Sequence, residues 1–433
     1  MRIATVVALG CAALVALTGV SPAQSPRYPT ATATDVGSAK LIVEPDLDAP
    51  ISGLQIFLTA GLDRQAAGSS GIAALVAECI ARTPVDGTPV REAIALRGGT
   101  LESTVDGRSV HYYLEARPEA LPAVVKLFGR ALAAPDFSAA TIAAARMSLS
   151  ARINELEGNA LNVGVEMFRR AYYATSAGLP TLGTTTTIAN LSSADLASFF
   201  AQNYRRGGFA ASAVGRVDPG LPDSLRALAD ALPGGEVTPV APKSKPIPEN
   251  SPRIVSHRDV GAPIVVVGFA APSPGTADFG AMLILESLLS NAFERSSATT
   301  LGLAERSVGA FYLYDSSPAS LVVYVNGTRV DPTLALRELL VVSHSLAQKP
   351  LGKDSLSKFK ATAEGQFITD SINVSDRSYL LGTFAAQGLG VDPINAALAS
   401  LEKTTPLDVQ RVAKRYLQRY IVALVLPRQA PSP

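Results

Sequence analysis

The side chains most often used in catalysis are few in this sequence and lie far apart. Its 433 residues include only three histidines, His111, His257 and His344. No two of them have the short spacing that places two metal ligands on one turn of helix. A G-x-S-x-G nucleophile elbow, a phosphate-binding loop and a C-x-x-C pair are all absent from the sequence. Each histidine is therefore expected to have a structural role.

Charge and composition exclude several classes of protein. The 38 lysines and arginines are balanced by 37 aspartates and glutamates, which gives a formal net charge of +1. Because there is no basic excess to contact phosphate groups, nucleic acid is not an expected partner. Hydrophobic residues make up 47% of the chain. We therefore expect a fold that rests on its apolar core and not on disulfides.

The first residues are typical of an export signal. Arg2 supplies a positive charge, residues 3–20 form an uncharged apolar run, and small residues at 21–23 offer a cleavage site. We therefore expect residues 1–23 to be a signal peptide and the mature protein to be periplasmic or extracellular. Because the apolar run is long, an uncleaved membrane anchor at the N-terminus is the alternative.

Hydrophobic periodicity predicts strands and helices that follow a loose leader at residues 24–39. Alternation from Leu54 to Leu58 predicts a strand with one buried face. The apolar residues of 72–82 recur every three or four positions, which predicts a helix with one buried stripe. Asp106-Gly107 is a strong turn signal and predicts a hairpin. Further helices are expected at residues 89–96, 118–133, 139–156 and 163–173.

The second half of the chain repeats the pattern of the first half. Residues 233–252 are rich in proline and predict an exposed interdomain linker. Ser192 and Thr405 each begin a Ser/Thr-x-x-Asp capping pattern that is followed by a helix and a strand. The simplest account is a duplicated unit, with an N-terminal domain at 40–232 and a C-terminal domain at 253–433.

Short motifs at the ends of these elements resemble the pitrilysin, insulinase and processing-peptidase family. The resemblance runs from about Lys40 to Leu426. It implies an α+β fold of two homologous sandwich domains, each with a mixed or antiparallel sheet covered by helices. The motifs that carry it are TAGLDR at 59–64, GIA at 71–73, GGT at 98–100, APDF at 134–137, LGT at 182–184 and DVQRVA at 408–413.

In active members of this family the first helix carries H-x-x-E-H. The resemblance implies that its histidines bind zinc, that its glutamate activates a bound water, and that a later glutamate completes the site. Here the aligned positions hold Ala74, Ala77 and Glu78, and the distal position falls at Arg152. A methyl group cannot bind a metal, and a guanidinium opposes one. We therefore expect no zinc cofactor and no catalytic base on the degenerate active-site helix at residues 71–82.

Two interpretations of the altered site stay open. Glu78 and Glu155 would together hold some other cation, or Arg152 would form a salt bridge with Glu78 across the vacated site. The salt bridge is the simpler interpretation, because carboxylates on helices are usually solvated or paired with arginine. Cys79 falls on the buried stripe and is expected to be a core residue.

A second feature of the family is an Arg/Tyr pair in the C-terminal domain that holds the substrate backbone. The resemblance places this pair at Ala304 and Phe311, so both side chains are replaced. Arg306 and Tyr312 are their neighbours and would substitute for them only in a shifted register.

These losses lead to three hypotheses for function. The first is an exported, non-catalytic partner or scaffold subunit of an active relative that retains H-x-x-E-H, because the family includes such heterodimers and scaffold proteins. The second is a stand-alone protein that binds extended peptides at a sheet edge formed by Leu101, Glu102, Ser103 and Thr104. The third is a metallopeptidase with an atypical site. Of these, enzymatic activity is the least expected.

Overall fold

The computed structural model describes residues 30–37, 39–238, 240, 243–296, 308–314, 318–327 and 331–428. The expected signal peptide at residues 1–23 lies outside these residues, as do Ala304 and Arg306. Within the described ranges, no helix is both long enough and apolar enough to cross a lipid bilayer.

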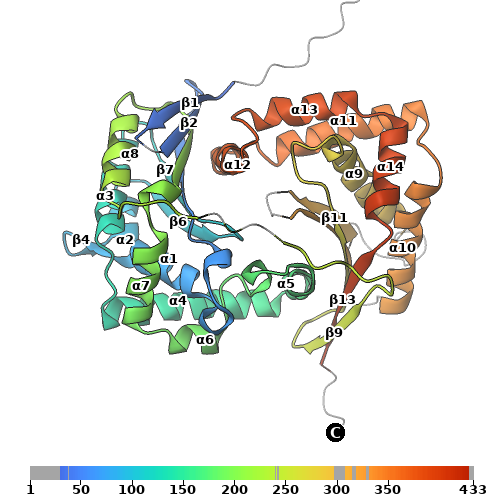
Figure 1. Cartoon of the computed structure of the whole chain (residues 1–433), viewed down its shortest axis with the longest axis horizontal. Helices are drawn as coiled ribbons and strands as arrows, with labels where there is room; N and C mark the ends of the chain where they lie inside the picture. Colours follow the sequence, from blue (N-terminus) through green and yellow to red (C-terminus); the bar gives the residue numbers. More distant parts are fainter. Residues whose placement is uncertain are drawn as a thin grey trace, which may run out of the picture.

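The first half is built on a six-stranded mixed sheet with the order β1-β2-β8-β3-β7-β6. This sheet lies in the half of the molecule that is drawn in blue and green in Figure 1. Strands β2 and β8 are parallel, and the other neighbours are antiparallel. β4 (Pro84–Val85) and β5 (Thr88–Pro89) form a separate pair. The strands of the large sheet are β1 (Thr32–Val36), β2 (Ala39–Pro45), β3 (Ser52–Leu58), β6 (Thr100–Val105), β7 (Val110–Ala116) and β8 (Phe209–Gly215).

Helices pack on this sheet and on one another. They are α1 (Ile72–Arg82), α2 (Val90–Ala95), α3 (Leu121–Ala133), α4 (Ala139–Gly158), α5 (Ala160–Tyr172), α6 (Thr185–Asn190), α7 (Ser193–Asn203) and α8 (Leu221–Asp230). Short 3-10 turns lie at Leu62–Arg64, Ala67–Ser69, Ser176–Gly178 and Arg206–Gly208. The single buried stripe expected for α1 is wrong, because every residue from Ile72 to Ala81 is buried. The reason is that α2, α4, α7 and β6 enclose this helix.

Two expectations for the strands also need correction. β3 is buried at every position and not on one face only, because helix α12 (Val374–Ala386) of the second half packs on it. Part of the leader, expected to be loose, forms β1. This strand pairs with β2 in an antiparallel register from Thr32↔Val43 to Val36↔Ala39, so the sheet begins earlier in the chain than expected.

The second half repeats this sheet and confirms the internal duplication. Its order is β11-β12-β10-β13-β9, which matches β6-β7-β3-β8-β2 strand for strand. The single parallel pair falls at the same place in both sheets, β2 with β8 and β9 with β13. The strands are β9 (Arg253–Arg258), β10 (Ile264–Ala270), β11 (Val308–Leu313), β12 (Ser320–Asn326) and β13 (Tyr420–Pro427).

The helices of the second half follow the same correspondence. α9 packs on β11 and α11 as α1 packs on β6 and α4. The capping patterns expected at Ser192 and Thr405 are confirmed, because each side chain accepts a hydrogen bond from the backbone of the aspartate three residues later. Besides α12, the helices are α9 (Phe279–Ser296), α10 (Pro332–Gln348), α11 (Lys353–Thr369), α13 (Pro393–Lys403) and α14 (Pro406–Tyr416).

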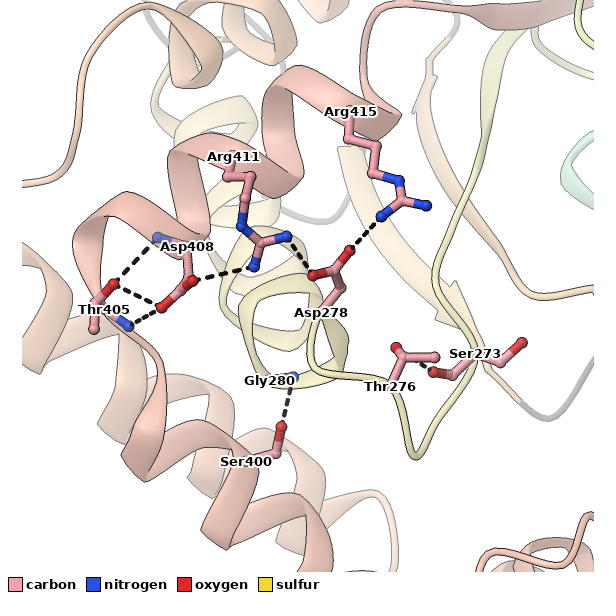
Figure 2. A network of polar contacts seen from close by, with 9 residues as sticks. All are labelled: Ser273, Thr276, Asp278, Gly280, Ser400, Thr405, Asp408, Arg411 and Arg415. Atoms are coloured by element: carbon pink, nitrogen blue, oxygen red, sulfur yellow. Dashed lines mark hydrogen bonds and ion pairs between the residues drawn. The ribbon is translucent and has the colours of Figure 1, made fainter.

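A polar network fixes the start of α9 against α13 and α14 (Figure 2). Asp278, directly before α9, has a side chain that is only 8% exposed. Its carboxylate accepts from Arg411 Nη1 at 2.5 Å and from Arg415 Nη1 at 3.4 Å. The Gly280 N–H donates to Ser400 Oγ at 2.9 Å. Side chains of two other helices therefore hold the first turn of α9 in place.

The two halves exchange a helix. α5 of the first half packs on β10 and β13 of the second, and α12 of the second packs on β3 and β8 of the first. Glycines allow close approach at both contacts. A Cβ added at Gly164 would lie 2.7 Å from Val266 Cγ2, and one at Gly382 would lie 2.0 Å from Phe57 Cε2. At these two points the halves approach too closely to admit an added methyl group.

Polar contacts strengthen the same junction. Arg377 of α12 pairs with Glu44 of β2 at 2.8 Å, and the two side chains are 10% and 8% exposed. Ser212 Oγ donates to the Ser378 carbonyl oxygen at 2.6 Å. Both contacts join residues of different halves. Because the groups are buried, separation of the halves would leave them without partners, which is costly.

The linker at residues 233–252 is largely exposed in its described part, as expected. It is nevertheless bound to the end of α5. The Lys245 N–H donates to the Tyr172 carbonyl oxygen at 2.7 Å, and the Ala174 N–H donates to that of Lys243 at 2.9 Å. These bonds join the middle of the linker to the first half.

Candidate functional site

Helix α1 places two of the three aligned positions in the apolar core. The helix begins after Gly71, whose φ of 92° lies in the left-handed region and whose N–H donates to Gln65 Oε1 at 3.1 Å. A Cβ at Gly71 would lie 2.6 Å from the Leu182 carbonyl oxygen, so only glycine fits this turn. Ala74 and Ala77 are 4% and 1% exposed. Both present a methyl group where the resemblance expects a ligand and a base.

The third position, Glu78, is held by two arginines. Its side chain is only 2% exposed. Arg91 Nη1 donates to Glu78 Oε1 at 2.8 Å and Arg91 Nη2 donates to Oε2 at 2.9 Å. Arg82 Nε, one turn along α1, donates to Oε1 at 2.8 Å. Both carboxylate oxygens are therefore occupied by guanidinium groups.

Electrostatics keeps this cluster in its charged form. Burial alone would raise the pKa of Glu78, but Arg91 and then Arg82 hold it below its usual value. The same contact with Glu78 raises the pKa of Arg91. One carboxylate between two guanidinium groups leaves a net positive charge, which disfavours a divalent metal at this position.

The salt bridge expected between Arg152 and Glu78 is wrong. Arg152 is exposed on α4, and the carboxylate is paired with Arg82 and Arg91 instead. Arg152 and Glu78 do line one cavity of about 510 Å³. Glu155 is exposed on α4 and is not among the residues that line this cavity. In the described part of the chain, no group of three or more histidine, cysteine, aspartate or glutamate side chains is placed to hold a metal.

The expected peptide-binding residues lie on a free sheet edge. β6 contains Leu101, Glu102, Ser103 and Thr104, and β7 is its only partner among the strands that the structure describes. Arg91 Nε donates to the Leu101 carbonyl oxygen at 3.3 Å, so the backbone groups of Leu101 point away from β7. Because this direction alternates along a strand, those of Ser103 point outward as well. The edge therefore offers one donor and one acceptor at Ser103.

A recess follows this edge. Thr104 and Arg152 line the cavity at Glu78, and they also line a second cavity of about 470 Å³. The second cavity continues between α4, α5 and the loop at 178–184, where Arg169 and Glu166 contribute charged groups. An extended chain that added a strand to β6 would therefore pass along a channel with space on its outer side.

His111 packs at the junction of the two halves. Its side chain is buried, with 7% exposure. Its Nδ1 lies 3.3 Å from Gln55 Oε1, and its ring packs at a tilt against that of Tyr379 of α12 with the centroids 4.9 Å apart. Burial lowers the pKa of His111 below its usual value. The residue is thus a neutral packing group between β7 and α12.

The other single candidates are not grouped with one another. His257 is exposed on β9, and His344 lies on α10 with its ring 6.1 Å from that of Tyr420. Cys79 is fully buried in the core of the first half. Burial raises the pKa of its thiol to about 12, so the sulfur stays protonated and unreactive.

The substrate-holding pair is described at one of its two positions. Phe311 lies on β11, partly buried, with its ring 6.0 Å from that of Tyr324. Its neighbour Tyr312 is buried, and its backbone N–H donates to Glu286 Oε1 at 2.8 Å. Sequence reasoning missed Glu286. The signal was present, because this glutamate is the only charged residue in the apolar run 279–289.

Family models match most of the chain. Residues 43–185 match the model described as insulinase, peptidase family M16. Residues 190–362 match the model described as peptidase M16 inactive domain. No curated protein matches this chain in sequence.

Solved structures share the fold across nearly the whole chain. A protease from Helicobacter pylori has a TM-score of 0.81 at 16% identity, covering 93% of this chain and 100% of that one. A peptidase M16 inactive domain from Pseudomonas fluorescens has a TM-score of 0.76 at 15% identity, covering 93% and 100%. A chain of complex III2 from Candida albicans has a TM-score of 0.73 at 14% identity, covering 90% and 94%. Likeness at this identity establishes the α+β fold of two homologous domains. The two family matches show that the chain belongs to peptidase family M16, the insulinase family.

Proposed function

We propose that this chain is a non-catalytic member of the family that serves as a partner or scaffold subunit of an active, exported relative. The pairing of Glu78 with Arg82 and Arg91 carries the proposal. These two guanidinium groups occupy the carboxylate at the position where the resemblance implies a zinc ligand. Active members use a zinc ion and a glutamate to activate a water, and this chain has neither the aligned ligands nor the aligned glutamate.

Recovery of the chemistry would need several coordinated changes. A metal at Glu78 would have to displace Arg91, which holds both carboxylate oxygens. The alanines at 74 and 77 supply no ligand atom, and Arg152 adds a further positive charge to the lining of the cavity. The loss therefore concerns charge as well as ligands.

The subunit role draws support from the proteins that share this fold. One is a chain of complex III2 and so belongs to an assembly, and another is described as an inactive domain. An exported partner follows from the signal peptide expected at residues 1–23. The expected partner is a relative with an intact H-x-x-E-H helix, which would supply the zinc site that this chain lacks.

A metal and activity assay tests the non-catalytic part of the proposal. The purified full chain would be incubated with zinc and freed of excess, and its metal content would be measured by mass spectrometry. We expect well below one zinc per chain and no chelator-sensitive cleavage of unfolded casein. One zinc per chain, with cleavage that a Glu78→Ala variant abolishes and a Glu402→Ala variant retains, would overturn the proposal.

A capture experiment tests the partner. The tagged chain would be isolated from its native host, and co-purifying proteins would be identified by mass spectrometry. We expect a stoichiometric relative that carries H-x-x-E-H and whose peptidase activity increases when this chain is added. A chain that remains a monomer and leaves the activity of such a relative unchanged would contradict the subunit role.

The free edge of β6 favours a second candidate function, the holding of extended peptides. Strand addition uses backbone groups, so it does not need the lost catalytic side chains. The outward N–H and C=O of Ser103 and the adjoining recess lined by Thr104 and Arg152 are the features that support it.

A pair of substitutions at one position tests this candidate. Ser103→Pro removes the outward N–H, whereas Ser103→Ala keeps both backbone groups, and proline is tolerated on an edge strand whose N–H faces outward. For an unstructured peptide measured by fluorescence anisotropy, we expect Ser103→Pro to weaken binding by about tenfold or more and Ser103→Ala to preserve it. Equal affinity of the two variants would rule out strand addition at this edge.

A further inference from the structure

A separate cavity lies in the second half, and it shares no lining residue with the recess beside β6. It has a volume of about 240 Å³ and is enclosed by α9, β11, α11 and α12. Three acidic side chains reach it from different elements: Glu286 from α9, Asp370 from the end of α11, and Asp376 from the first turn of α12. Asp370 and Asp376 are exposed, which places them where the cavity meets solvent.

The internal duplication relates this cavity to the one at Glu78. Because α9 corresponds to α1, β11 to β6 and α11 to α4, the two cavities occupy equivalent places in the two halves. Glu78 and Glu286 both lie in the second turn of their helices. Each half of the chain thus places a glutamate carboxyl group at the equivalent cavity, Glu78 in the first half and Glu286 in the second.

The partners of these two carboxyl groups differ. Glu78 has Arg82 and Arg91, but no lysine or arginine is among the described residues that line the cavity at Glu286. Glu286 Oε1 accepts the Tyr312 N–H at 2.8 Å. The positive charge that the chain supplies in the first half is therefore missing from the described lining in the second.

Aromatic rings form much of the remaining wall. Tyr312 and Tyr314 have centroids 5.6 Å apart, and Tyr314 and Phe367 have centroids 5.8 Å apart. Phe311 and Tyr379 line the same cavity. Aromatic faces attract an organic cation and also cover its apolar stem.

We propose that this cavity binds an alkylammonium group, with Glu286 and Asp370 as its anionic contacts and the rings of Tyr314 and Phe367 along its stem. A volume below that of drug-sized pockets suits one side chain or a small amine and not a whole peptide. The proposal concerns a different cavity from the recess at β6, so it does not depend on the proposed function.

An organic cation fits this lining better than a metal ion does. Calcium or zinc requires several oxygen, nitrogen or sulfur ligands around one point. In the described residues, no group of three or more acidic, histidine or cysteine side chains has that arrangement. The aromatic rings of the lining would contact the rest of the ligand, and such rings pack well against an alkyl stem.

The site is held in a defined position before any ligand arrives. Asp278 at the start of α9 is fixed by Arg411 and Arg415, and Gly280 is bonded to Ser400 (Figure 2). Glu286 lies two turns further along the same helix. A preorganised carboxyl group costs little ordering entropy on binding.

The protonation of Glu286 gives the proposal a second signature. Burial raises the pKa of Glu286 to about 8, the Tyr312 N–H opposes this, and the charge of Asp370 adds to it. An ammonium ligand stabilises the carboxylate, so binding releases a proton from Glu286 and becomes tighter as pH rises from 6 to 8. The other ionisable groups that line the cavity are Asp370, Asp376, Tyr312, Tyr314 and Tyr379.

Titration calorimetry on the full chain tests the inference. The probes are an extended peptide with one central lysine, the same peptide with norleucine in its place, and free butylamine. We expect the lysine peptide or butylamine to bind at pH 8 at least about tenfold more tightly than the norleucine peptide, with weaker binding at pH 6. The tighter of the two amines identifies the source of the ammonium group, and either one supports the site.

Matched variants assign the binding to this cavity. Glu286→Gln keeps the shape and removes the charge, Asp370→Asn does the same at the mouth, and Glu402→Gln alters an exposed glutamate of α13 as the control. We expect the first two to weaken amine binding by about tenfold or more and the control to leave it unchanged. The inference would be overturned if neither the lysine peptide nor butylamine bound more tightly than the norleucine peptide. Amine binding that Glu286→Gln and Asp370→Asn leave unchanged would also overturn it, as would calcium binding in place of amine binding.

Discussion

Arg91 and Glu78 face each other across the altered site, with Nη1–Oε1 and Nη2–Oε2 distances of 2.8 and 2.9 Å. This two-point contact is the strongest geometry available to a guanidinium and a carboxylate. Arg91 also donates to the Leu101 carbonyl oxygen, so a single side chain connects α1, α2 and the edge strand β6. The altered site has thereby become a structural joint of the first half.

Removal of Arg91 should weaken the fold. In Arg91→Ala, Glu78 stays buried with Arg82 alone, so we expect the free energy of unfolding to fall by about 1–3 kcal/mol in urea titration. Arg130→Ala is the control, because its ion pair with Asp86 is exposed on both sides and should contribute little. Similar losses in the two variants would show that the buried pairing has no special role.

Restoration of the zinc motif alone should fail. The triple variant Ala74→His, Ala77→Glu and Glu78→His forces two large polar side chains into positions that are 4% and 1% exposed. We expect a lower melting temperature and no stabilisation by added zinc, because overpacking is costly and Arg91 and Arg152 remain at the cavity. A zinc-dependent rise in melting temperature, measured by calorimetry, would show that the lost ligands are the only barrier.

Added bulk at the junction of the halves should destabilise the whole chain. A Cβ at Gly382 would lie 2.0 Å from Phe57, so we expect Gly382→Ala to lower the free energy of unfolding by about 1–3 kcal/mol. Gly365 in α11 has nothing within 4 Å of an added Cβ. Gly365→Ala should therefore stabilise the protein by about 0.5–1 kcal/mol. Thermal unfolding of both variants checks the contrast, and a neutral Gly382→Ala would show that the junction yields easily.

The ionisation of Glu286 should make stability depend on pH. Its pKa is raised by burial from 4.5 to about 8, so the folded chain favours the protonated acid. Stability from this group is complete below pH 4.5 and is lost as pH rises toward 8. We expect Glu286→Gln to gain stability relative to the unchanged chain across this window, by up to about 1.4 kcal/mol per pH unit. Urea titrations at several pH values measure the difference, and a constant difference would contradict the buried acid.

Local patterns in the sequence predict most elements of this fold. The helix at 72–82 and the hairpin at Asp106-Gly107 are confirmed, because periodicity and turn residues act over a few positions. The same patterns missed β11 and β9. They also gave the wrong exposure for β3, since they show which face is apolar and not which distant helix covers it.

The site shows a similar limit. The alignment of short motifs located Ala74, Ala77 and Glu78 on one helix, as the structure has them. It chose Arg152 as the partner of Glu78, because the distal ligand position lay there. The choice among arginines depends on how α2 packs against α1, and Arg91 is nearer. No local pattern contains that information.

The exchanged helices α5 and α12 make each half of the chain depend on the other for burial of its sheet. Each covers the sheet of the opposite half, so a single half, expressed alone, would leave an apolar sheet surface bare. Two identical copies could lend each other that helix across a twofold axis and hide both surfaces. The present polypeptide is thus packed as such a homodimer would be, except that one half holds a carboxylate between two arginines and the other holds a cavity lined by acidic residues.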